Sequence, residues 1–203
     1  MNHDLVSVLR ANMGATLNPD LAADIMLAAD QMPTLVHLER IERIQPEQCG
    51  EFTFAVEKME DIQEEMKPLH RAHFEETEGH RHQLELKPDY DLFAKYERAG
   101  RYVLFTLRNG EKLVGDCAMY IAKSAHTQTL LSREDTLYLL PEARKGRVAN
   151  RFVAYVENSL RQIGVCEINI TVKTVNKAGR FFRMLGYKHT EIGLTKTLGV
   201  SNA

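Results

Sequence analysis

Residues 137–164, LYLLPEARKGRVANRFVAYVENSLRQIG, decide how the fold of this chain is interpreted. The apolar run at 137–140 is typical of a buried strand, and Pro141 ends it because proline cannot donate a ladder hydrogen bond. After a basic turn, apolar residues recur at helical spacing up to Gly164, which stands where a helix stop is expected. The stretch therefore predicts a strand, a glycine-containing basic turn and a long helix. Free amides at such a helix start, with cations beside them, favour an anion, most often a phosphate.

The composition is that of an ordinary globular protein. With 203 residues, 44% of them hydrophobic, the chain can build one domain with a sizeable core. Its 26 basic and 28 acidic residues nearly cancel, so no nucleic acid or membrane partner is indicated. The N-terminus lacks a signal-peptide pattern, and the three cysteines have no metal-ligand spacing. We expect a cytoplasmic protein whose cysteines are reduced and mostly buried thiols.

The first 48 residues differ in pattern from the rest. Short apolar faces at helical spacing, one of them after the start signal Asn18-Pro19-Asp20, predict helices. Pro33 and Pro46 interrupt the rest of this segment. The stretch LVHLERIERI between them fits either a short helix or a strand. We therefore expect an N-terminal helical extension at 1–48 and a main domain at 49–203.

The main domain mixes strand and helix patterns. A turn at Asn109-Gly110 predicts a hairpin, because both residues tolerate positive φ. The order is a strand at 51–59, helices at 59–79 and 88–100, the hairpin at 101–123, the strand-turn-helix unit above, a strand at 166–173, a short helix ending at Gly186, and a last strand or two within 187–198. This order predicts an α+β fold around a mixed sheet.

That order, together with two local signatures, resembles the GNAT superfamily of acetyl-CoA-dependent N-acyltransferases over about residues 51–198. The signatures are LYLLPEARKGRVANRFV and NKAGRFFRMLGY. The stretches EMKPLHRAHFEE and PDYDLFAKYERAGRY are also similar to acyltransferases encoded by tailed bacteriophages. The resemblance implies a mixed, mostly antiparallel central sheet flanked by helices, with the family's fourth and fifth strands splayed.

Acetyl-CoA is the co-substrate that the resemblance implies. The family's pyrophosphate motif (Arg or Gln, two residues, Gly, one residue, Gly or Ala) falls on Arg144, Lys145, Gly146, Arg147, Val148 and Ala149, with Arg147 where glycine is usual. The amides of residues 145–149 would wrap the pyrophosphate, since backbone donors need no particular side chain.

The pantetheine arm of the cofactor would fill the gap between the splayed strands. Unpaired backbone groups near Tyr138, Leu139 and Leu140 would bind it, and an N–H there would stabilise the developing oxyanion. Asn176 resembles the family's helix-start asparagine, which implies either a contact with the pantetheine or a cap of the helix. Phe182 would pack in the core or contact the cofactor.

The transfer also needs a base and an acid. Glu134 and Asp135 match the position of a base, and His126 is another candidate. On a regular strand, Glu134 and Tyr138 share one face and Asp135 lies on the other. The family's acid is a tyrosine at the position that Phe182 occupies, so Tyr138, Tyr187 or water would replace it, or the thiolate leaves unaided, or catalysis is lost.

Four histidines in the segment HRAHFEETEGHRH raise the question of a metal site. A charged helix and a polar loop explain them more simply, so we expect no metal there and a role in lining the acceptor groove. They are His70, His73, His80 and His82.

The functional expectation is an acyltransferase that moves the acetyl group of acetyl-CoA directly to an amine. The acceptor would be a small molecule, or a lysine or N-terminus of a protein. Two alternatives stay open: a catalytically inactive module that binds CoA or a protein partner, and an enzyme or binder of a macromolecule that docks through residues 1–48. The same segment is also compatible with a homodimer contact.

Overall fold

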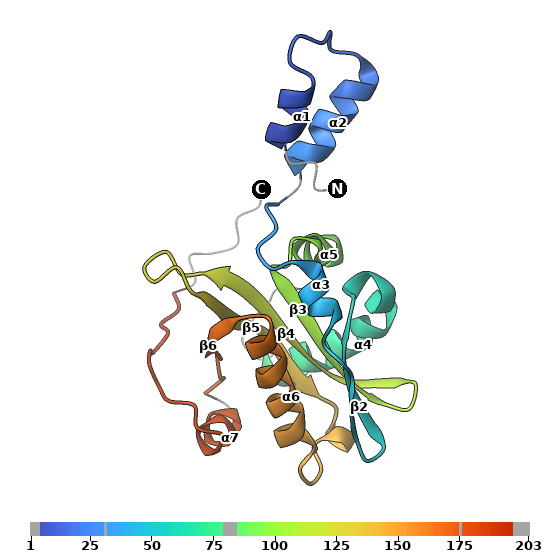
Figure 1. The fold of residues 1–203 in the computed structure, drawn as a ribbon. Helices are drawn as coiled ribbons and strands as arrows, with labels where there is room; N and C mark the ends of the chain where they lie inside the picture. Colours follow the sequence, from blue (N-terminus) through green and yellow to red (C-terminus); the bar gives the residue numbers. More distant parts are fainter. Residues whose placement is uncertain (1–4, 31, 79–84, 175, 197–203) are drawn as a thin grey trace. The chain divides into compact units, whose positions relative to one another are not determined.

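The computed structural model describes residues 5–30, 32–78, 85–174 and 176–196, and its fold is drawn in Figure 1. The chain divides into two compact units, Met1–Thr171 and Val172–Ala203. Among the described residues, no helix has the length and apolar character required to cross a membrane. The division that we predict at residue 48 stays a prediction.

Three helices precede the sheet: α1 (Leu5–Ala11), α2 (Pro19–Asp30) and α3 (Leu38–Glu42). The predicted start signal is used, because Asn18 Oδ1 accepts a hydrogen bond from the amide of Leu21 at 2.8 Å. The stretch that fits helix or strand forms α3. Its neighbourhood belongs to the main core, since Val36, Ile41 and Ile44 are buried with side chains from the sheet and α6.

Six strands form one sheet in the order β1-β2-β3-β4-β5-β6. All neighbours are antiparallel except β5 and β6, which run parallel, so the predicted mixed, mostly antiparallel sheet is confirmed. The strands are β1 (Glu47–Cys49), β2 (Phe52–Glu57), β3 (Tyr102–Asn109), β4 (Lys112–Lys123), β5 (Leu130–Leu139) and β6 (Val165–Asn169).

The β3–β4 hairpin forms as predicted, but its turn lies one residue later. Asn109 pairs with Lys112, so the two turn residues are Gly110 and Glu111. Gly110 has a φ of 58°. Its neighbours Asn109 and Glu111 have negative φ, because Gln128 is the only non-glycine residue with positive φ in the described chain. Glycine alone therefore provides the left-handed conformation at this turn.

Helices cover both faces of the sheet (Figure 1). On one face α6 (Val148–Gln162) packs on a core that includes Phe54, Phe105 and Phe152. On the other face, α4 (Met59–Thr77) and α5 (Tyr90–Arg98) enclose a second core that includes Met66 and Leu104. This is the predicted sheet flanked by helices.

The strands β5 and β6 part after a short paired segment, which confirms the predicted splay. Their register runs from Leu130 opposite Val165 to Arg133 opposite Asn169, and no described residue of β5 after Arg133 pairs with β6. The prediction of a strand over 166–173 is correct only up to Asn169, because the following residues have no neighbour in the sheet.

The second unit contains α7 (Ala178–Met184), the short helix that the sequence predicts. The predicted last strand is wrong for the described residues 187–196, which form no regular structure. Their apolar side chains are exposed, Ile192 at 89% and Leu194 at 94%, so no neighbouring strand buries an alternating face here. Residues 197 and 198 lie outside the described part of the chain.

The expectation that the three cysteines are mostly buried is wrong. Cys117 is buried, Cys49 is partly buried and Cys166 is exposed.

Candidate active site

The open edge of β5 is the central feature of the candidate site. The amide of Leu140 donates to the carbonyl of Val114 on β4 at 2.8 Å. Because backbone groups alternate in direction along an antiparallel strand, the backbone of Tyr138 also faces β4, and that of Leu139 faces the open edge. Of the three residues whose backbone we expect to bind the cofactor arm, only Leu139 therefore has its N–H on that edge.

A β-bulge interrupts β5 beside this edge. Ala118 pairs with Thr136 and Met119 with Glu134, so Asp135 is the extra residue. The bulge breaks the strand's alternation, and the carboxylate of Asp135 meets Tyr102 on the α4/α5 side of the sheet. The expectation that Asp135 lies on the face opposite Tyr138 is wrong. Glu134 lies opposite Met119, which belongs to the core under α6.

Within the described chain Asp135 accepts one hydrogen bond, which the Tyr102 hydroxyl donates to its Oδ2 at 2.9 Å. Burial raises the pKa of Asp135, while the bond from Tyr102 opposes that rise. The other predicted base, Glu134, accepts a hydrogen bond from the amide of Thr171 at 3.2 Å. Burial therefore makes Asp135 more basic than an ordinary aspartate.

Asp116 is a second carboxylate near the bulge that our sequence reasoning did not single out. Its side chain is fully buried; Oδ2 accepts a hydrogen bond from the Thr136 hydroxyl, and Oδ1 has no partner among the described residues. Burial raises its pKa to about 7, and the charges of Asp135 and Glu134 add to the rise. The signal in the sequence is an aspartate inside the apolar strand LVGDCAMYI.

Tyr138 belongs to a polar cluster with Glu76, Arg144 and His73. Its hydroxyl donates to Glu76 at 3.1 Å, its ring stacks on His73 with 5.0 Å between centroids, and the Arg144 guanidinium lies 5.1 Å from its ring centre. Burial and the bond to Glu76 raise the pKa of Tyr138. A buried phenol with a raised pKa and an engaged hydroxyl is a weak candidate for the acid of the reaction.

The guanidinium of Arg144 binds other residues of the protein, although the side chain is 40% exposed. Two of its nitrogens bind the carboxylate of Glu76 at 2.9 and 2.7 Å, and Nε donates to the carbonyl of Leu139 at 2.7 Å. The hydrogen bonds from Arg144 are the main cause that lowers the pKa of Glu76. Arg144 thus fixes the point where β5 ends against α4.

The rest of the basic turn is open. Lys145, Gly146 and Arg147 are exposed, and Gly146 has a φ of 55°. The amide of Val148 donates to the carbonyl of Lys145 at 3.2 Å, so it is not available as we predicted. Within the described chain, the amides of Gly146, Arg147 and Ala149 donate to no acceptor. These three donors and two cations suit an anionic group at the start of α6.

His126 lies away from this centre, and Asn176 and Phe182 belong to the second unit. His126 is exposed in the loop between β4 and β5, at the far end of β5 from Leu139. Asn176 and Phe182 belong to the second unit: Asn176 Oδ1 accepts from the amide of Ala178 at 2.9 Å, and Phe182 packs on the ring of Tyr187.

The histidines of α4 have structural surroundings. His70 is buried and its Nδ1 lies 3.2 Å from the hydroxyl of Tyr90; burial lowers its pKa to about 4. His73 stacks on Tyr138. His80 and His82 lie outside the described residues.

Comparison with known proteins places this geometry in a fold family. No family model and no curated protein sequence matches the chain. Among solved structures, an aminoglycoside acetyltransferase from an uncultured soil metagenomic sample is similar over 73% of this chain and 97% of its own, with a TM-score of 0.60 and 15% identity. A ribosomal-protein-alanine N-acetyltransferase from Brucella melitensis biovar Abortus 2308 has a TM-score of 0.56 and 15% identity over 73% of this chain and 99% of that one. A structure from Bacillus halodurans C-125, described as a transcriptional regulator, reaches 0.56 at 20% identity over 72% and 99%.

These similarities show the fold. The curled six-stranded sheet, parted between β5 and β6 and flanked by helices, is that of GNAT acetyltransferases.

Proposed function

We propose that this chain is an N-acetyltransferase that moves the acetyl group of acetyl-CoA directly to an amine on a small molecule or a protein. The observation that carries the proposal is the open edge of β5, which has a carboxylate at the bulge and a basic turn at its end. The names of two similar structures, an aminoglycoside acetyltransferase and a ribosomal-protein-alanine N-acetyltransferase, support an amine as the acceptor class.

The residues at the end of β5 fit a pyrophosphate. The amides of Gly146, Arg147 and Ala149 are available, and Lys145 and Arg147 supply exposed positive charge. Arg144 would act differently from its place in the family pattern, because its guanidinium is bound to Glu76 and Leu139. We assign it to positioning the turn rather than to contacting phosphate.

Asp135 is the base that we propose. When bound, acetyl-CoA supplies a thioester whose carbonyl carbon is open to attack. The amine forms the new C–N bond, the C–S bond breaks, and Asp135 takes the proton that the acceptor nitrogen loses. A backbone N–H on the open edge, such as that of Leu139, would stabilise negative charge on the carbonyl oxygen. Water would protonate the departing thiolate, since the Tyr138 hydroxyl is bound to Glu76.

The test is acetyl-CoA binding by calorimetry to the natural chain and to Gly146→Asp and Gly146→Asn. A Cβ at Gly146 meets no atom within 4 Å, and Asn and Asp both tolerate the φ of 55°. The two variants therefore differ in charge alone. We expect Gly146→Asn to retain binding within a few-fold and Gly146→Asp to lose at least about tenfold, from repulsion near the phosphates. Absence of binding to the natural chain would overturn the proposal.

One observation favours a second candidate, a CoA-binding module without catalysis. Phe182 stands where the resemblance implies an acid, and the hydroxyl of Tyr138, another candidate acid, is bound to Glu76. Binding of acetyl-CoA without thiol release across a panel of small amines and peptides would favour this candidate. A cytoplasmic location, the likeness to phage-encoded enzymes, and a docking or dimer role of residues 1–48 remain predictions.

A further inference from the structure

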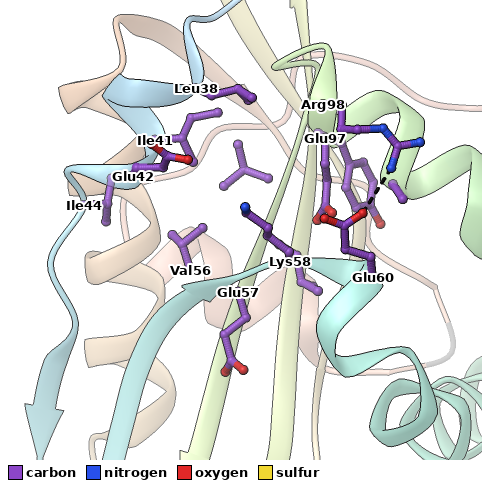
Figure 2. A pocket seen from close by; sticks show the side chains of 14 residues that line it. Leu38, Ile41, Glu42, Ile44, Val56, Glu57, Lys58, Glu60, Glu97 and Arg98 are labelled. Atoms are coloured by element: carbon purple, nitrogen blue, oxygen red, sulfur yellow. Dashed lines mark hydrogen bonds and ion pairs between the residues drawn. The ribbon is translucent and has the colours of Figure 1, made fainter.

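A cavity of about 160 Å³ lies between α3 and the adjoining ends of α4 and α5, and its lining includes residues of both cores (Figure 2). It is enclosed by α3, the start of α4, the end of α5, and the adjoining ends of β2 and β3. Its lining combines apolar side chains with charged ones. The apolar lining is Leu38, Ile41, Ile44, Val56, Ala94, Val103 and Leu104; the charged lining is Glu42, Glu57, Lys58, Glu60, Glu97 and Arg98.

The carboxylate of Glu97 is a polar group with a fixed position in the cavity lining. Its Oε2 accepts a hydrogen bond from the amide of Met59 at 2.9 Å, which fixes the carboxylate at the first turn of α4. Its other oxygen forms no hydrogen bond with any described residue. In Figure 2 the Glu97 carboxylate lies close to that of Glu60, at the same side of the cavity.

The charges around Glu97 leave an excess of carboxylate. Glu60 is paired with Arg98 at 3.1 Å, and Glu57 with Arg108 at 2.8 Å. Lys58 lines the cavity and forms no ion pair within the described chain, while Glu42 on α3 adds a further negative charge. Together with Arg108, three cations stand against four carboxylates, which leaves one net negative charge.

We propose that this cavity binds a small molecule that carries one ammonium group on an apolar body about the size of a benzene ring. An apolar cavity of about 150 Å³ is large enough for benzene, which sets the size of the body. The ammonium would bind the free oxygen of Glu97, and burial of the apolar body would supply most of the remaining affinity.

The site is separate from the carboxylate that we propose as base. Tyr102 stands between them: it lines the cavity, and its hydroxyl donates to Asp135. The inference therefore does not rest on acetyl transfer. A ligand in the cavity would contact Tyr102 and not Asp135 itself.

The pH dependence of binding follows from the groups that face Glu97. Burial raises its pKa to about 7, with further contributions from Glu60 and Asp61, whereas the Met59 amide and Arg98 lower it. Lys58, Glu42 and Tyr102 also line the cavity. Because the ammonium requires the ionised carboxylate, affinity should fall about tenfold between pH 8 and pH 6.

Calorimetry with three matched probes tests the proposal: benzylamine, benzyl alcohol and benzoate, each at pH 8 with the full chain. We expect benzylamine to bind at least tenfold more tightly than the other two. Glu97→Gln keeps an oxygen for the Met59 amide and should abolish the preference for the amine. Glu39→Gln, an equal change of charge at an exposed α3 residue outside the cavity, should retain it.

Two further variants locate the binding. Ala94→Leu fills the cavity and should weaken benzylamine binding if circular dichroism shows a folded chain. Asp135→Asn should leave it unchanged, which separates this site from the proposed catalytic carboxylate and from any failure of acetyl-CoA to bind. Equal binding of the amine and the alcohol, or an unchanged preference in Glu97→Gln, would overturn the proposal.

Discussion

The substitution Tyr102→Phe tests the environment of Asp135 directly. The Tyr102 hydroxyl is the donor that the structure places on the Asp135 carboxylate, at 2.9 Å, and the phenol is 1% exposed. Phenylalanine preserves the ring, which packs on Phe93 and Tyr120, and removes only the hydroxyl. The substitution therefore isolates a single hydrogen bond.

The magnitude follows from the energy of that bond. A hydrogen bond to a charged group contributes about 1.5–3 kcal/mol, and about 1.4 kcal/mol corresponds to one unit of pKa. The bond stabilises the ionised form of Asp135, so its loss raises the pKa of a carboxyl that burial already raises. We expect an upward shift of about 1–2 units.

The assay is the pH profile of kcat/KM for thiol release from acetyl-CoA, measured with an acceptor amine that supports turnover. If Asp135 is the base, activity rises as its carboxyl ionises. The acidic limb should therefore move to higher pH in Tyr102→Phe, with a smaller change in the plateau. Asp135→Asn should remove that limb together with most of the activity.

The matched control is Tyr120→Phe, because its ring contacts Tyr102 but no hydrogen bond joins its hydroxyl to Asp135 in the described chain. Its acidic limb should stay within a few tenths of a pH unit. An unmoved limb in Tyr102→Phe, or a limb that moves to lower pH, would refute the assignment of Asp135 as a base tuned by Tyr102.

Three further predictions concern stability, each measured by urea unfolding. Asp116→Asn should stabilise the fold at pH 8 and not at pH 4. Folding raises the pKa of Asp116 from 3.8 to about 7, so the natural chain loses stability as the pH rises through this window. The loss is on the order of 4 kcal/mol at most. An equal effect at both pH values would contradict this. Gly100→Ala should cost about 2–4 kcal/mol, since its Cβ would lie 1.9 Å from the Val36 carbonyl oxygen at a φ of 61°. Gly110→Ala, with a φ of 58° and no atom within 4 Å, is the control and should cost about 1 kcal/mol. Because the pKa of His70 is lowered from 6.5 to about 4, stability should fall by up to about 3 kcal/mol as pH drops through that window, and His70→Leu should flatten this dependence.

The sequence predicts most of the elements because their signals are local. The cap of α5, in which Asp89 accepts from the Leu92 amide at 2.9 Å, and the stop at Gly164, with a φ of 98°, follow from residue type at one position. The mixed sheet follows from the order of these elements together with the family resemblance. Tertiary context decided the rest: the short stretch that became α3, the end of β6 at Asn169, and the lack of a strand within the described residues 187–196.

The candidate site is predicted less well because its key features are not local. The bulge at Asp135 arises from the pairing of β4 with β5, and it reverses the face that simple alternation assigns to this residue. The partner of Arg144 is Glu76, which lies 68 positions earlier on α4. No pattern around residue 144 indicates that partner. Similarly, the sequence indicates only that Tyr102 belongs to a strand. Its hydroxyl reaches Asp135 because of the way the sheet is packed.

The distribution of charge gives the open edge of β5 two distinct ends. The bulge lies beside two carboxyls, Asp135 and Asp116, whereas the turn after β5 presents Lys145 and Arg147 beside free amides. The positive charge of Arg144 adds little to this distribution, because it is paired with the carboxylate of Glu76. An anion such as a pyrophosphate is therefore favoured at the turn, and a cationic amine at the bulge. A single carrier that spans the edge from turn to bulge would present its reactive end to the amine, which is the arrangement that direct transfer requires.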